Sequence, residues 1–108
     1  MLVLFDHGPP RGLARFLAGH TVKRARAQGW DRLRNGELLD ATEAGGFDVL
    51  LTTDKNIRHQ QNLAGRTIAL VVLGHSTWPV VRLYVERVVA AVNAATLGSY
   101  TEVDIPTS

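Results

Sequence analysis

A short apolar run in the middle of the chain constrains the fold more than any other feature. Residues 49–51 read Val-Leu-Leu and lie between the pair Gly45-Gly46 and a polar stretch that opens with Asp54. An apolar run of this length, bounded by turn formers, is typical of a strand buried on both faces. Such strands belong to sheets with helices on both sides, so the run predicts an α/β protein with Asp54 at a strand end.

Strand and helix patterns alternate along the rest of the chain. We expect strands over residues 2–5, 20–23, 48–53, 68–73 and 100–105. We expect helices over residues 10–18, 35–45, 58–63 and 79–95, and a short helical turn plus loop within 24–34. Glycines follow several of these segments, for example Gly19 and Gly98, as is common at helix ends. The chain therefore contains the repeated strand–helix units from which parallel sheets are built.

This alternation predicts a three-layer sandwich around a mainly parallel sheet of four to five strands. Because crossover connections are right-handed, helices cover both faces only if the sheet grows first in one direction and then in the other. The most economical strand order is 2-1-3-4-5, with the more polar strands 20–23 and 100–105 at the edges. Ligands of such sheets bind at the carboxyl ends of the strands where the order reverses, here between strands one and three.

Composition excludes several classes of protein. The 108 residues suit a single domain over residues 1–105, with a tail at 106–108. There is no cysteine, which excludes disulfide scaffolds and thiolate metal sites and fits the cytoplasm. The longest apolar-rich stretch, residues 79–97, is interrupted by Arg82, Glu86 and Arg87, so we expect no membrane span. The net charge of +2 permits contact with nucleic acid without requiring it.

Three acidic residues are candidates for a metal site. Asp6 and Asp54 follow the first and third predicted strands, and Glu37 lies in the first turn of the helix that precedes the third strand. Three ionised carboxylates about 5 Å apart would repel by roughly 3 kcal/mol per pair at an effective dielectric near 20, so such a cluster needs a cation or shifted pKa values. Oxygen ligands select hard ions such as Mg²⁺ or Mn²⁺. These ions suggest phosphodiester chemistry.

The segments around these acids resemble the PIN-like domains. The matching segments are LFD at Asp6, NGELL at Glu37, and LLTTDKN followed by QQNLAG around Asp54. The resemblance spans residues 1 to about 73 and is most specific in 46–65, and it points to a short stand-alone branch of prokaryotic proteins related to toxin components of toxin–antitoxin pairs. It implies a Mg²⁺- or Mn²⁺-dependent endoribonuclease with Asp6, Glu37 and Asp54 as catalytic and metal-binding residues. Implied partners are RNA and an antitoxin protein.

Two further groups of residues are candidates for substrate contact. After Asp54 the chain offers cationic and amide side chains that suit a phosphate: Lys55, Asn56, Arg58 and Gln61. The strongest local concentration of basic residues contains one aromatic side chain: Lys23, Arg24, Arg26, Arg32 and Arg34, with Trp30 among them. Most such runs are solvated surfaces, but the combination also suits single-stranded RNA, and Lys23, Arg24, Arg26 and Trp30 are the candidates for that contact. Exposed apolar positions on the last helix, such as Leu83, would favour a partner or a homodimer.

Each acidic residue also has a structural alternative. Asp6 and Asp54 are turn and cap formers at strand ends, and Glu37 is favourable near a helix N-terminus without any metal. PIN nucleases usually carry a fourth acid shortly after the third, where this chain has Lys55 and Asn56. A PIN-like module that binds RNA or a partner protein without cleaving therefore remains an alternative. A phosphoacceptor receiver domain ranks last, because the chain lacks the second acid after Asp6 and a late lysine.

Overall fold

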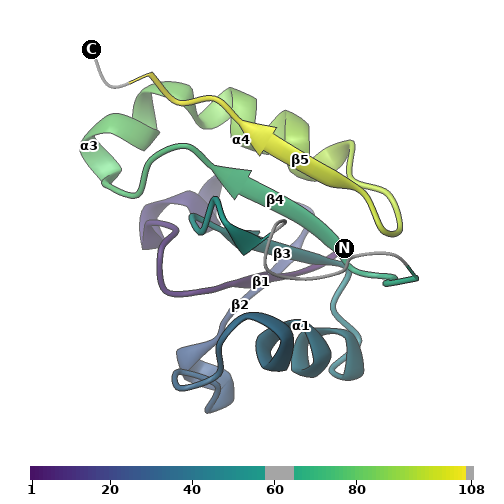
Figure 1. Ribbon diagram of the computed structural model, residues 1–108. Coiled ribbons are helices and arrows are strands. Elements are labelled where there is room, and N and C mark those ends of the chain that lie inside the picture. Colours follow the sequence, from purple (N-terminus) through teal and green to yellow (C-terminus); the bar gives the residue numbers. More distant parts are fainter. Residues whose placement is uncertain (58–64, 107–108) are drawn as a thin grey trace.

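A computed structural model describes residues 1–57 and 65–106, which contain a five-stranded, entirely parallel sheet (Figure 1). The strand order is β2-β1-β3-β4-β5. The predicted fold class and strand order are therefore confirmed, with β2 and β5 at the edges. The strands are β1 (Leu2–Phe5), β2 (Thr21–Arg24), β3 (Val49–Thr52), β4 (Ala69–Leu73) and β5 (Tyr100–Val103).

The helices depart from the prediction in two places. The helix expected over 10–18 is a 3₁₀ helix, and the continuous helix expected over 79–95 is wrong, because Tyr84 leaves helical geometry with φ −125° and ψ 25°. The valine spacing gives no sign of this break, since Val81 and Val88 are both buried on either side of it. The predicted helix over 58–63 lies outside the described residues. The helices are η1 (Arg11–Phe16), η2 (Arg26–Gln28), α1 (Asn35–Ala44), α3 (Trp78–Val81), η3 (Arg82–Tyr84) and α4 (Val85–Asn93).

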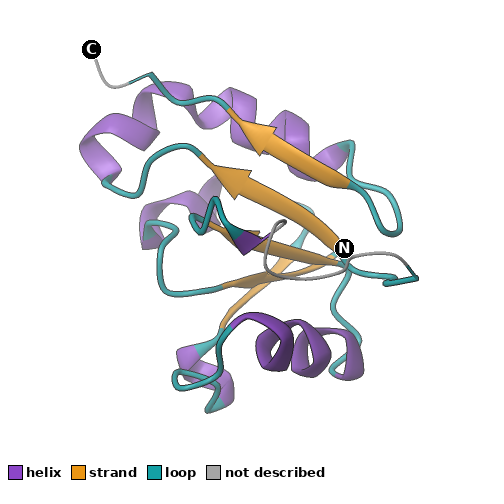
Figure 2. Cartoon of the chain, in the orientation of Figure 1, coloured by secondary structure: helices purple, strands orange, loops and turns teal. Residues whose placement is uncertain are grey.

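Helices cover both faces of the sheet (Figure 2). A hydrophobic core lies on each face. Successive residues of a strand point to opposite faces, and β3 shows this directly, since Leu50 belongs to one core and Leu51 to the other. The Leu50 core is covered by α1 through Leu38 and Leu39. The Leu51 core is covered by η1, α3 and α4. The central strands therefore have no solvent-exposed face, and polar groups gather at the strand ends.

The register of β1 and β3 sets two strand ends side by side. Phe5 pairs with Leu51, and the N–H of Asp6 donates to the carbonyl oxygen of Leu51 at 3.1 Å. The chain adds β2 on one side of β1 and then adds β3, β4 and β5 in turn on the other side. The direction of growth thus reverses between β1 and β3, where Asp6 and Asp54 follow the strands.

An ion-paired contact joins the end of α1 to the segment that enters β4. The Arg66 guanidinium donates to carboxylate oxygens of Asp40, at 2.8 Å, and of Glu43. The second Glu43 oxygen accepts the N–H of Thr67 at 2.7 Å and its hydroxyl at 3.1 Å. Burial of Glu43, the largest influence, would raise its pKa, but the bonds from Thr67 and Arg66 outweigh it, and the pKa lies below the ordinary 4.5.

Replacing Glu43 by glutamine is expected to lower the free energy of unfolding by about 1 kcal/mol at pH 7. A carboxylate with a depressed pKa stabilises the fold above its unfolded-state pKa, and that contribution is lost as the pH falls below about 4. Urea unfolding of both proteins at about pH 7 and pH 3 checks this, with Glu86→Gln on the exposed side of α4 as control. A difference that stays the same at both pH values would contradict the ionic contribution.

No helix among residues 1–57 and 65–106 is long and apolar enough to cross a membrane. The helices α1 and α4 contain 10 and 9 residues, and each presents one side to a core and the other to solvent.

Candidate functional site

Asp6 and Asp54 line one small cavity at the carboxyl ends of β1 and β3. The cavity has a volume of about 140 Å³, and both carboxyl-bearing residues are partly buried in the fold. Its wall combines the two acids with a histidine, an arginine and three apolar side chains: Asp6, His7, Leu33, Arg34, Leu38, Asp54 and Ile57. The expected juxtaposition of the two strand-end aspartates is therefore present. A small anionic pocket is formed at the point where the strand order reverses.

Thr52 connects the two aspartates. It is the last residue of β3 and is fully buried, with 0% of its surface exposed. Its hydroxyl donates to the Asp6 carboxylate and accepts the backbone N–H of Asp54 at 3.1 Å. Thr52 was not among the residues predicted for the site. The available signal was a threonine at the last position of an otherwise aliphatic buried strand, where a hydroxyl needs a partner.

Both carboxylates also hold their own turns. The N–H of Gly8 donates to Oδ1 of Asp6 at 3.0 Å, and the N–H of Asn56 donates to Oδ1 of Asp54 at 3.0 Å. A Cβ at Gly8 would overlap the Thr53 side chain, so glycine is needed at this close approach. The turn-forming role given as an alternative is thus present. Because each carboxylate oxygen has two lone pairs, a turn hydrogen bond leaves acceptor capacity for a ligand.

Burial raises the pKa of Asp6 above its ordinary 3.8. The hydrogen bonds from Thr52 and Gly8 and the charge of nearby His7 act in the opposite direction, and the Asp54 carboxylate adds a small further increase. Withdrawal from water destabilises the charged form of an acid. The carboxylate of Asp6 is therefore held in an environment that a bound cation would relieve.

Replacing Asp6 by asparagine is expected to raise the free energy of unfolding at pH 7, by about 0.5–1 kcal/mol. The raised pKa means that ionised Asp6 costs stability in the fold, so the gain grows as the pH rises from the ordinary value through the folded-state pKa and is then constant. Urea unfolding between about pH 4 and pH 8 measures it, with exposed Asp104→Asn as control. A loss of stability would mean that the bonds to the charged carboxylate outweigh its burial.

Glu37 does not join the two aspartates in the cavity. It lies exposed in the first turn of α1 and is not part of the cavity wall. Within the described ranges, no three His, Cys, Asp or Glu side chains come together in a group that could hold a metal ion. The structure thus brings together two of the three predicted acids, and a metal role for Glu37 stays a prediction.

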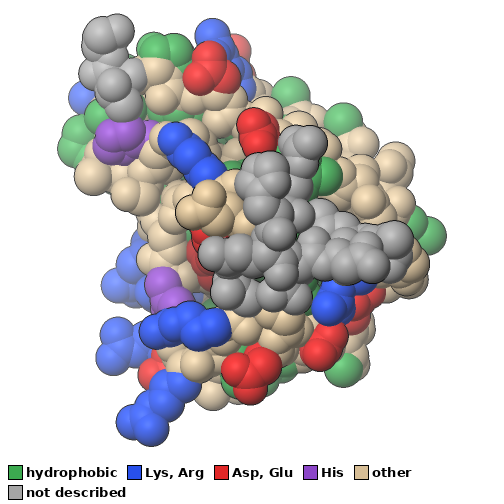
Figure 3. Space-filling view, viewed as in Figure 1, with side chains coloured by type: hydrophobic (Ala, Val, Ile, Leu, Met, Phe, Trp, Pro, Cys, Tyr) green, Lys and Arg blue, Asp and Glu red, His purple; other side chains and the backbone are tan. Residues whose placement is uncertain are grey.

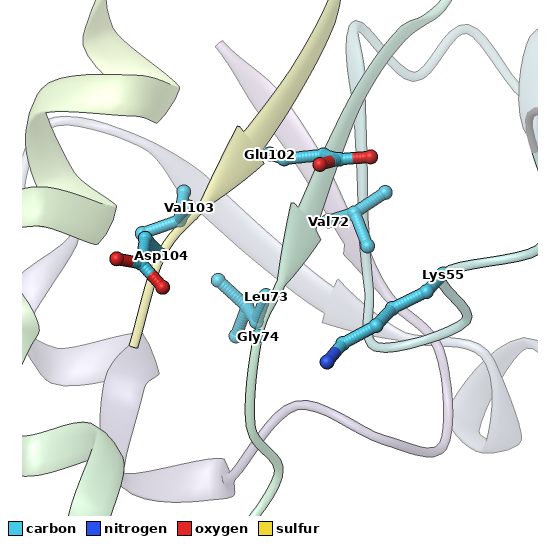
Figure 4. Close-up of a pocket in the computed structure, with 7 residues that line it drawn as sticks. All are labelled: Lys55, Val72, Leu73, Gly74, Glu102, Val103 and Asp104. Carbon is cyan, nitrogen blue, oxygen red and sulfur yellow. The ribbon is translucent and has the colours of Figure 1, made fainter. Parts of the chain in front are cut away.

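The two described residues of the predicted phosphate-binding group, Lys55 and Asn56, lie in different parts of the surface. The exposed Lys55 lines a different cavity of about 350 Å³, together with Glu102, Asp104 and the last residues of β4. Figure 4 shows the Lys55 side chain extended towards Gly74 at the end of β4. Asn56 is exposed next to Asp54, while Arg58 and Gln61 lie outside the described residues. Of the two members of this predicted substrate-binding group that the structure describes, Asn56 lies directly beside the carboxylate cavity, through its backbone bond to Asp54.

The predicted basic surface contains one residue used for packing. Trp30 is half-buried and meets Phe47 edge-on, with ring centroids 5.8 Å apart. Lys23 and Arg26 are exposed, and Arg24 is partly buried. Figure 3 shows Lys and Arg side chains gathered beside a histidine at the lower left of the molecule. A nucleic-acid role for Lys23, Arg24, Arg26 and Trp30 stays a prediction, and the packing of Trp30 restricts the ring surface left for a base.

Comparison of the chain with family models, with curated proteins and with solved structures gives no match.

Proposed function

We propose that this protein is a metal-dependent ribonuclease of the PIN-like type, acting in the cytoplasm. One observation supports it above the others: Asp6 and Asp54 share a cavity at the reversal point of a parallel sheet, with Thr52 bonded to both. Ligands of α/β sheets bind at this position. The PIN-like resemblance supplies the reaction class and further suggests an antitoxin protein or a second copy of the chain as a partner.

The donor set of the cavity fits a hard divalent cation. Mg²⁺ is commonly held by one or two carboxylates, with water and substrate phosphate completing its shell. Asp6 and Asp54 would hold it, and Glu37, from the first turn of α1, is the candidate third acid. When bound, such an ion lowers the pKa of a water molecule and offsets charge on the phosphate.

The chain's own residues have separate roles in this proposal. The Thr52 hydroxyl bonds the Asp6 carboxylate and the backbone N–H of Asp54, and so holds the two aspartates together at the cavity. The apolar side chains of Leu33, Leu38 and Ile57 in the cavity wall limit competing water and strengthen attraction to a cation.

The test is cleavage of labelled single-stranded RNA by purified protein with Mn²⁺. We expect cleavage by the wild type, none in EDTA, and loss to background in Asp6→Asn and Asp54→Asn. A Glu37→Gln variant measures whether the third predicted acid contributes. Equal cleavage by the wild type and both aspartate variants would identify a contaminating nuclease and overturn the proposal.

A second candidate is a PIN-like module that binds RNA or a partner protein without cleaving it. It is favoured by the number of acids in the cavity, which is two in the described part of the chain. It predicts RNA binding in EDTA, no cleavage with either metal, and no measurable Mn²⁺ binding by calorimetry.

A further inference from the structure

A wide, shallow hollow adjoins the carboxylate cavity. The hollow has a volume of about 490 Å³ and is lined by His7, Arg26, Asp31 and Arg34. His7 and Arg34 also belong to the wall of the carboxylate cavity. The two spaces therefore adjoin at these two side chains.

Arg26 and Arg34 of the hollow have no carboxylate partner among the described residues. In residues 1–57 and 65–106 the carboxylate ion pairs are those of Arg66, so neither Arg26 nor Arg34 is neutralised there. Arg34 donates to the carbonyl oxygens of Asp31 and Leu33 at 3.4 and 3.5 Å, which is long for a hydrogen bond. Among the described residues, Asp31 is the acid that lines this hollow, and no ion pair links it to either arginine. The hollow thus presents more cationic than anionic groups.

We infer that Arg26 and Arg34, here called the cationic ledge, with His7 as a neighbouring hydrogen-bonding group, bind successive phosphates of a single-stranded nucleic acid whose reacting phosphate lies at Asp6 and Asp54. This inference rests on the proposed function and names the path of its substrate. Arg34, which lines both spaces, is the positioning residue nearest the reacting phosphate. Arg26, which lines the hollow alone, receives a phosphate further along the strand.

Charge balance gives the ledge a physical role. Two carboxylates repel an incoming phosphodiester, so a site built on Asp6 and Asp54 needs positive groups at its entrance as well as a cation within it. A guanidinium matches two phosphate oxygens with paired N–H donors. Arg34 lines the cavity itself and Arg26 lines the adjoining hollow, so both guanidinium groups lie where they can supply that compensation.

The composition of the ledge also predicts how far binding depends on the base sequence of the nucleic acid. Trp30, the aromatic side chain of the basic segment, packs against Phe47 and lines neither the hollow nor the carboxylate cavity. The contacts expected at the ledge are therefore with phosphates, which position a strand but carry no sequence information. We expect binding with little preference among base sequences.

The test is binding of a fluorescein-labelled oligouridylate of twelve nucleotides, measured by fluorescence anisotropy over a range of salt concentrations. EDTA is present throughout, so that metal-dependent cleavage is absent. Arg34→Gln and Arg26→Gln are each expected to weaken binding by about 3- to 10-fold and to reduce the salt slope by about 0.7. The matched control is Arg82→Gln, which removes an exposed arginine of η3 in the helical layer on the opposite face of the sheet. Its binding should equal that of the wild type.

Equal effects of the three substitutions, or none, would overturn the ledge. Its failure can be separated from failure of the proposed function. Cleavage by the wild type with ledge variants that bind normally would overturn the ledge and leave the ribonuclease intact. Binding that depends on Arg34 and Arg26, without Mn²⁺-dependent cleavage, would support the ledge on a non-catalytic module. If the enzyme cleaves, Arg34→Gln should raise KM more than it lowers kcat.

Discussion

Replacing Leu50 by alanine is expected to lower the free energy of unfolding by about 2–5 kcal/mol. Leu50 is fully buried in β3, the central strand, and packs in the core under α1. The loss combines removal of apolar surface from the core with a cavity that strands paired on both sides cannot close. Urea unfolding monitored by circular dichroism measures the change.

Leu51 makes the prediction specific to a sheet covered on both faces. Its side chain is equally buried but belongs to the opposite core, beneath η1, α3 and α4. Leu51→Ala is therefore expected to cost a similar amount, within the same range of about 2–5 kcal/mol. Leu97→Ala is the control, because Leu97 is 79% exposed, and it should change stability by less than about 0.5 kcal/mol. A large loss for one of the two core variants alone would contradict the three-layer packing.

The central strand explains why much of the fold was predictable. An apolar run bounded by turn formers specifies a strand with two buried faces, and the direction of each crossover then leaves few strand orders. Adjacent parallel strands end at the same edge of a sheet, so the strand order also predicts that Asp6 lies beside Asp54. These inferences depend on backbone geometry and on burial, both of which are encoded locally in the sequence.

Other features depend on contacts that the sequence pattern does not encode. The valines of residues 79–95 keep a helical spacing, and the break at Tyr84 becomes visible only in its backbone angles. Trp30 stands among basic residues, which suggested nucleic acid, but its position beside Phe47 is set by tertiary packing. Glu37 lies in the first turn of α1, as predicted. The direction of its side chain depends on how the helix is rotated about its own axis, and a weakly periodic sequence does not determine that rotation.

The charge pattern of the site links stability to the proposed activity. Asp6 is held in a partly buried position that raises its pKa, next to a second carboxylate and an arginine without a carboxylate partner in the described residues. A fold selected for stability alone would gain from a neutral side chain at this position. Sites that bind cations and anions commonly carry such a cost, because the ligand relieves it. The expected stabilisation by Asp6→Asn and its expected loss of cleavage are two consequences of one arrangement.

Replacing Thr52 by valine is expected to damage the site while keeping the shape of the strand. Valine preserves the branched side chain but leaves the Asp6 carboxylate without this donor and the Asp54 N–H without its acceptor. Leaving buried polar groups unpaired costs about 1–3 kcal/mol, which should appear in urea unfolding. Because residues that orient a metal-binding side chain typically change metal affinity or activity by about 10- to 100-fold, we expect a decrease of at least about tenfold in Mn²⁺-dependent cleavage.

Serine is the matched control at position 52. Thr52→Ser retains the hydroxyl and therefore both hydrogen bonds, and removes a single buried methyl group at a cost of about 1 kcal/mol. Cleavage by Thr52→Ser should stay within about threefold of the wild type, since the outer-shell bond is preserved. If the valine and serine variants cleave equally well, the hydroxyl does not orient the aspartates. If both lose activity in proportion to their stability, Thr52 supports the strand alone. A loss confined to valine therefore separates a role in the site from a role in the core.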